Sequence, residues 1–209
     1  MLRYLALSIV LVGTWLAADE SAEFKLVAPD SWGGETISLP PGFAPDMALQ
    51  GDEHIRFAPG MMKASSDTFF TYAFVFELEK TPELKDDLIK DEFLKYYRGL
   101  CTAVLNGARP DVDPEKFTFD LEKEEQDANK NQDGSFPSGT HLYQGKLTWV
   151  EPFATRAPQT LNLEIQTWTS GERNYLFACV SPQTRKAKIW KELHKIRDTY
   201  LKDHHKSRD

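Results

Sequence analysis

A run of oxygen-bearing side chains at every second position is the strongest candidate for chemistry in this sequence. The four residues are Asp127, Asn129, Asn131 and Asp133. Such side chains can converge on Ca²⁺, which is bound in proteins by oxygen ligands. A calcium loop also needs glycine at its sixth position and a bidentate glutamate at its twelfth; counted from Asn129, Gly134 fits but Thr140 does not. The alternative is a plain solvated connection, and we predict no metal or other cofactor.

Side chains that could act as nucleophile, base or metal ligand do not form any other recognisable motif. None of the five histidines has a second ligand at metal-binding spacing on the same strand or helix face. The chain has no G-x-S-x-G motif and no glycine-rich phosphate loop. Glu122 and Glu124 lie on the outward positions of an alternating strand, which indicates exposure to solvent. We therefore predict no catalytic residues.

Two cysteines, Cys101 and Cys179, are the only candidates for a disulfide. Cys101 lies on the apolar stripe of a predicted helix, four residues after Tyr97, and Cys179 shares a strand face with Tyr175 and Phe177. If that helix covers that strand face, both thiols point into one layer, and export would favour a bridge. The alternative is two separate buried thiols that pack as small apolar residues.

Trp168 is the candidate binding residue. It falls on the polar face of an alternating strand, next to a predicted hairpin turn. An exposed tryptophan can anchor a partner or ligand. The alternative is that Trp168 packs under the last helix.

The first 18 residues have the pattern of a secretory signal peptide. Arg3 supplies the positive charge, residues 5–16 are apolar, and Ala17-Ala18 offers a small-residue cleavage site. The apolar run is shorter than the ~20 residues needed to span a bilayer, and no second long run follows. We expect a secreted or periplasmic protein without an integral membrane span.

Charge is divided unevenly along the chain. Residues 19–181 hold 15 Lys and Arg against 28 Asp and Glu, whereas residues 182–209 hold 9 against 4. An acidic body argues against nucleic acid as a partner, because phosphate binding needs clustered positive charge. The basic end is either a solvated helix face or a segment that touches an anionic surface.

Hydrophobic periodicity predicts strands and two amphipathic helices. The strands are expected at 24–28, 35–39, 54–58, 68–79, 117–125, 140–151, 160–168 and 173–181, with helices at 81–105 and from about 182 onward. Residues 32–79 have the pattern of a β-meander, and the strand at 68–79 is apolar on both faces, which is typical of a sheet covered on both sides. Ser170-Gly171-Glu172 predicts a hairpin turn.

These elements define the predicted fold class. We expect α+β architecture: an antiparallel sheet of about seven or eight strands, covered by two amphipathic helices. Residues 19–209 form a single domain in this interpretation, and residues 203–209 are expected to be a frayed tail.

Three segments, GGETISLPPGFAPDM, IRFAPGM and FFTYAFVFELE, resemble the start of PsbP-like domains. The resemblance covers the first third of the chain that follows the signal peptide. It implies an α/β sandwich that is usually not an enzyme. The binding residues of that group have no match here, so the resemblance implies no particular ligand.

We therefore predict a non-catalytic, exported binding or accessory module. Its partner would be a protein or a small ligand in the cell envelope or the extracellular space. Two alternatives stay open: a hydrolase whose site is not visible in the sequence, and a structural component of the envelope.

Overall fold

The computed structural model describes residues 26–79, 83–125 and 136–206. Its centre is one sheet of seven antiparallel strands in the order β1-β2-β3-β7-β6-β5-β4. The strands are β1 (Gly33–Leu39), β2 (Gly51–Phe57), β3 (Tyr72–Leu78), β4 (Thr118–Lys123), β5 (His141–Val150), β6 (Pro158–Ser170) and β7 (Arg173–Ser181). The α+β class and the antiparallel sheet are as predicted.

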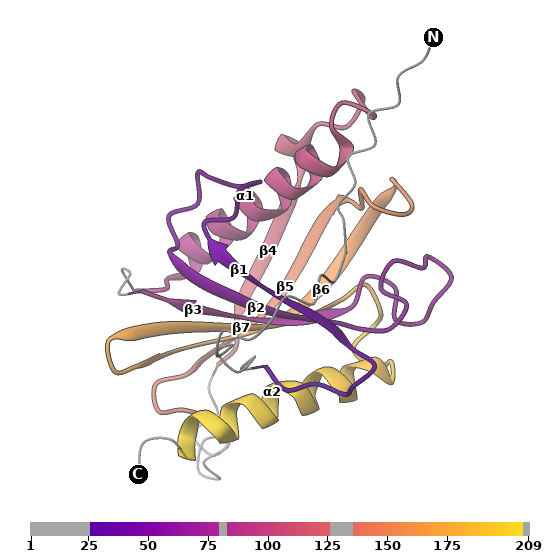
Figure 1. The fold of residues 1–209 in the computed structure, drawn as a ribbon. Helices are drawn as coiled ribbons and strands as arrows, with labels where there is room; N and C mark the ends of the chain where they lie inside the picture. Colours follow the sequence, from indigo (N-terminus) through magenta and orange to yellow (C-terminus); the bar gives the residue numbers. More distant parts are fainter. Residues whose placement is uncertain (1–25, 80–82, 126–135, 207–209) are drawn as a thin grey trace, which may run out of the picture.

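Two helices cover the sheet, one on each face, so that the protein has three layers (Figure 1). Helix α1 (Asp86–Leu105) lies on one face and α2 (Ile189–Lys206) on the other. A short 3-10 helix, η1 (Pro114–Lys116), precedes β4. The predicted arrangement of a sheet with two covering helices is confirmed.

Strands β3 and β7 lie at the centre of the sheet, where both faces are covered. Every residue of β3 is buried, and β7 is buried from Tyr175 onward. Val75 of β3 pairs with Phe177 of β7, and both point toward α2. This confirms the inference that a strand apolar on both faces lies between two layers.

The core on the α1 side is the larger one and is rich in aromatic rings. Phe93 of α1 stacks on Phe119 of β4 with ring centroids 5.1 Å apart, and Tyr97 contacts Trp149 edge-on at the same distance. Offset and edge-on ring contacts of this kind add stability beyond the area they bury. Alternation therefore places Phe119, Leu147 and Trp149 inward as predicted.

The core on the α2 side is formed by β3, β7, part of β6 and the inner face of α2. Leu193, Ile196 and Tyr200 of α2 are buried there, as the predicted apolar stripe requires. Trp168 stacks on Tyr175 with ring centroids 5.2 Å apart and is only 3% exposed. Trp168 therefore packs beneath the last helix and is not an exposed anchor.

Several predicted boundaries are wrong. The strand expected at 24–28 is absent over its described residues, 26–28. Helix α1 begins at Asp86 and not near residue 81, and α2 begins at Ile189 because residues 182–188 form turns. Helix α2 continues to Lys206, so residues 203–206 of the expected tail are helical.

The hairpin between β6 and β7 forms where its turn residues predict it. Ser170 pairs with Arg173 across a two-residue turn. Gly171 has a φ of 61°, a left-handed conformation that glycine adopts without a steric cost. The turn residues therefore define the register of β6 against β7.

The predicted disulfide is not supported. Cys101 lies in the core on the α1 side, where its thiol donates to the Val150 carbonyl oxygen at 3.6 Å. Cys179 lies in the core on the α2 side, opposite Ala73. The sheet separates the two thiols, and both are free and buried. Helix α1 covers the face of β7 that is opposite to the face carrying Cys179.

Candidate functional site

Strands β4 and β5 present polar side chains on the α2 side of the sheet. Their apolar side chains point toward α1, so alternation sends the intervening residues to the opposite face. We name these exposed residues the β4–β5 polar face: Thr118, Asp120, Glu122, Gln144, Lys146 and Thr148. Glu122 is therefore exposed on this side of its strand, as predicted.

A cleft of about 420 Å³ lies along β4 and β5, and it includes Lys90 of α1 as well as residues of this face. Its lining consists of Lys90, Asp120, Leu121, Glu122, Gln144, Gly145, Lys146 and Arg185. Asp120 is directly opposite Lys146 in the strand register, and Glu122 is opposite Gln144. The cleft thus carries two acidic side chains on β4 beside one lysine and one glutamine on β5, and this lining suits a polar partner better than an apolar one.

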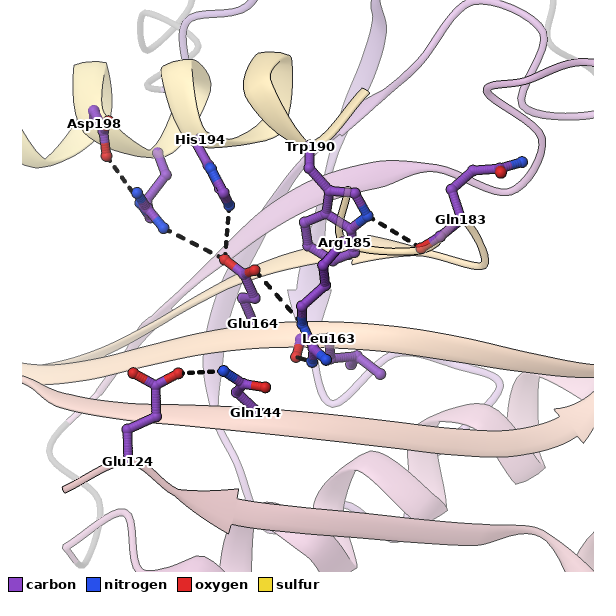
Figure 2. A network of polar contacts seen from close by, with 10 residues as sticks. Glu124, Gln144, Leu163, Glu164, Gln183, Arg185, Trp190, His194 and Asp198 are labelled. Atoms are coloured by element: carbon purple, nitrogen blue, oxygen red, sulfur yellow. Dashed lines mark hydrogen bonds and ion pairs between the residues drawn. The ribbon is translucent and has the colours of Figure 1, made fainter. Parts of the chain in front are cut away.

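A polar network centred on Glu164 borders the cleft (Figure 2). Glu164 of β6 lies opposite Gln144 in the sheet and reaches up to α2. Its carboxylate lies 2.7 Å from Nε2 of His194 and 3.6 Å from both Nε of Arg185 and Nη1 of Arg197. Three cationic or protonatable groups from two elements therefore converge on one carboxylate.

The neighbours of Glu164 keep its carboxylate charged. Burial alone would raise the pKa of Glu164, but the hydrogen bond from His194 and the charges of Arg197 and Arg185 outweigh it and lower the pKa. Glu164 is about one-fifth exposed, whereas His194 is more open to solvent. An imidazole oriented by an ionised carboxylate is a group that can bind a proton or orient a ligand.

Contacts to the backbone anchor the rest of the network. Arg185 donates through Nη2 to the Leu163 carbonyl oxygen at 3.0 Å, and its guanidinium lies 6.0 Å from the centre of the Trp190 ring. The Trp190 indole N–H donates to the Gln183 carbonyl oxygen at 3.1 Å. These contacts hold the turns before α2 against β6, so the cleft border is rigidly placed.

A second cleft of about 490 Å³ lies between α1 and the segment that follows β1. The Arg98 guanidinium there is held by the carbonyl oxygens of Pro114 and Glu115 and by the Glu115 carboxylate. Lys95 is paired with Asp91 and Glu92. These cations serve the fold, so this cleft is a weaker candidate for binding.

Among the described residues, three carboxylates have no exposed surface at all, and two of them stabilise turns. Glu92 accepts hydrogen bonds from the backbone N–H groups of Ala48 and Leu49. Glu151 accepts from three successive N–H groups that begin at Phe153. Charge-assisted bonds of this kind offset the cost of burying a carboxylate. Both residues therefore have a structural role.

The third buried carboxylate, Glu53 of β2, has a different environment. The Tyr96 hydroxyl donates a hydrogen bond to its Oε2 at 3.1 Å. Burial raises the pKa of Glu53 to about 8, while the Tyr96 hydrogen bond opposes the rise and the charge of Glu35 adds to it. Glu53 is therefore a neutral carboxylic acid at pH 7, enclosed in the core.

The sequence-predicted site residues are not brought together by the fold. Trp168 and the two cysteines are buried in the cores, and the candidate calcium loop, Asp127, Asn129, Asn131 and Asp133, lies outside the described residues, as does the predicted signal peptide. Within the described residues, no group of three His, Cys, Asp or Glu side chains could hold a metal ion. In that same part of the chain, no helix has the length and apolarity to cross a membrane.

Sequence reasoning missed the Glu164 network. His194 was visible as a histidine on the last helix, and Arg197 follows three residues later on the same side. Their carboxylate partner comes from a strand 30 residues earlier, and no spacing rule links the two. The available signal was that Glu164 is the one charged residue of β6.

Comparisons with known proteins do not identify a family. Neither a protein-family model, nor a curated protein, nor a solved structure matches this chain.

Proposed function

We propose that this protein is a non-catalytic binding or accessory module that works outside the cytoplasm, either secreted or in the periplasm. The β4–β5 polar face would carry the role, with a protein or a small polar ligand of the envelope as the partner. The supporting observation is the cleft along β4 and β5, where Asp120 and Glu122 lie beside Lys146 and Gln144 on paired strands, next to the Glu164 network. Sites on strands hold their side chains in fixed positions, which favours specific recognition.

Charge on the cleft residues supports recognition better than it supports chemistry. Asp120 and Lys146 are exposed and lie on adjacent strands, so neither is desolvated as a reactive group would be. Rim charges of this kind steer a partner and set its orientation. The proposal therefore assigns the cleft to partner selection.

A PsbP-like fold remains part of this proposal. That resemblance implies an α/β sandwich, and a sheet with one helix on each face agrees with it. Its first segments fall on β1, β2 and β3, where they form the expected meander. Fold alone does not decide function, so the resemblance adds no ligand to the proposal.

The test is a charge swap within the cleft. Asp120→Lys combined with Lys146→Asp keeps the net charge and the opposite-sign pair but inverts the pattern that a partner meets. The control swap, Lys63→Asp with Asp67→Lys, changes exposed residues in the loop before β3. We expect wild-type and control proteins to recover the same partner from an envelope extract, and the cleft swap to lose it. Equal recovery by the cleft swap would refute the assignment of this face.

One observation favours an enzyme as the second candidate. The hydrogen bond between His194 and Glu164 is a base–carboxylate pair at the border of a cleft, as hydrolases use to activate water. Reproducible turnover in a hydrolase panel that is lost in His194→Gln but kept in His141→Gln would replace the binding proposal. We expect the panel to be silent.

A further inference from the structure

The outer side of α2 carries a line of lysines directly opposite its buried face. Leu193, Ile196 and Tyr200 point into the core. Lys191, Lys195 and Lys202 are exposed and follow one another at intervals of four and seven residues. At 100° per residue these three lysines lie within about 40° of each other, on the side facing away from the sheet.

We name this line, together with Lys188 in the turn before α2, the α2 lysine ridge. Its helical part spans 12 residues, from Lys191 to Lys202, a rise of about 16 Å along the axis. None of the four ammonium groups has an ion-pair partner within the described residues. Two acids of α2 have described side chains; Asp198 is bound by Arg197 at 2.9 Å, so Glu192 is the one left to offset these lysines. The ridge is therefore a surface of excess positive charge.

Lysines and arginines have separate places in this region. Arg185 and Arg197 are turned inward to Glu164, whereas the ridge consists of lysines alone. Arginine matches a defined carboxylate with two parallel bonds, while lysine acts as a mobile point charge. A row of mobile point charges fits a surface with many interchangeable anions better than a single shaped protein epitope.

The rest of the chain strengthens this contrast. Residues 19–181 carry 15 basic against 28 acidic side chains, so the excess positive charge is confined to the region of α2. An acidic body is repelled by an anionic surface and turns the ridge toward it. The exposed large apolar side chains among the described residues are Val27 and Met62, neither of them on α2, so contact would be electrostatic and without insertion.

We infer that the α2 lysine ridge docks this protein on a membrane surface that contains anionic lipid. The inference goes beyond the proposed function and does not depend on it, because the ridge faces away from the sheet that carries the cleft. Each lysine near such a surface strengthens partition roughly fivefold, and salt weakens the effect.

Vesicle binding tests the inference. The full chain is mixed with phosphatidylcholine vesicles, either pure or with about one third phosphatidylglycerol, and co-sedimentation is measured at low and high salt. We expect binding to the anionic vesicles that is lost at high salt. An apolar N-terminal segment would bind both vesicle types, so the difference between them isolates charge.

Matched variants locate the contact. Lys191→Gln, Lys195→Gln and Lys202→Gln together should weaken binding to anionic vesicles about 100-fold, from the fivefold contribution of each lysine. The control carries the same change at the exposed residues Lys63, Lys116 and Lys123 and should bind like wild type. An equal loss of vesicle binding in both triple variants, or no loss in the first, would refute the assignment of the contact to the ridge.

A further experiment tests whether the ridge binds an acidic protein and not anionic lipid. Retention on immobilised poly-glutamate that depends on the ridge, with no binding to anionic vesicles, would overturn the lipid assignment. Binding to pure phosphatidylcholine as strong as to the anionic vesicles would also refute it.

Discussion

The substitution Glu53→Gln should remove a pH dependence from the stability of this protein. Glu53 is fully buried and accepts a hydrogen bond from the Tyr96 hydroxyl at 3.1 Å. Burial is the main cause that raises its pKa from 4.5 to about 8. Glutamine has nearly the same shape and keeps the contact with Tyr96 but has no proton to lose.

The direction follows from proton linkage. The folded protein keeps the Glu53 proton up to about pH 8, whereas the unfolded chain releases it near 4.5. The unfolded state therefore binds fewer protons in this window, and the free energy of unfolding falls as pH rises from about 4.5 to about 8. The difference between the two pKa values of Glu53 corresponds to a change of roughly 5 kcal/mol in the free energy of unfolding, as an upper limit.

The measurement is urea unfolding of wild type and Glu53→Gln across this pH window. We expect similar stability at the acid end and a variant that is more stable by several kcal/mol at the alkaline end. Subtracting the two curves of unfolding free energy against pH cancels the contribution of groups that titrate in both proteins. Glu122→Gln, at an exposed position, is the control and should show no such trend. A difference between wild type and Glu53→Gln that stays constant with pH would refute the reasoning.

Three further outcomes are expected. Native protein should react slowly with a thiol reagent, because burial raises the pKa of Cys101 to about 11 and raises that of Cys179 further. Protein that is unfolded without reduction should show two reactive thiols. One reactive thiol or none would refute the placement of the two cysteines in different layers. Gly99→Ala should lower stability by about 1–3 kcal/mol in chemical unfolding, since its methyl would lie 2.2 Å from a loop carbonyl oxygen, whereas Gly42→Ala meets nothing within 4 Å and should be neutral. Glu164→Gln should destabilise the protein above the ordinary glutamate pKa and progressively less as pH falls, because the lowered pKa of Glu164 contributes stability only where it is ionised; a loss independent of pH would contradict this.

The sequence predicts the strands that lie in the middle of the sheet and the residues that point inward. The apolar character of both faces of the 68–79 segment predicts burial on both sides, and β3 is buried throughout. Alternation places Leu161, Leu163 and Ile165 inward, and all three are fully buried. These predictions succeed because a strand alternates with a period of two whatever surrounds it.

Boundaries next to turns are predicted less well. Residues 68–71 have the apolar content of a strand, but Phe70 has a φ of 47° and lies in a turn. Residues 182–188 begin with a proline, which can start a helix, yet Arg185 donates to a carbonyl of β6 and Trp190 donates to the Gln183 carbonyl in the turn. Contacts to distant strands override local preference in both places.

The sequence by itself determined the α+β class, the antiparallel pairing, the β6–β7 hairpin and the polarity of each strand face. Only the tertiary structure decided which helix covers which face, so it placed the two thiols in different layers and Trp168 beneath α2. It also brought Glu164 to His194 and Glu53 to Tyr96, 30 and 43 residues apart. The physical reason is that periodicity reports whether a side chain points inward or outward from its own element, whereas its partner depends on the path of the whole chain.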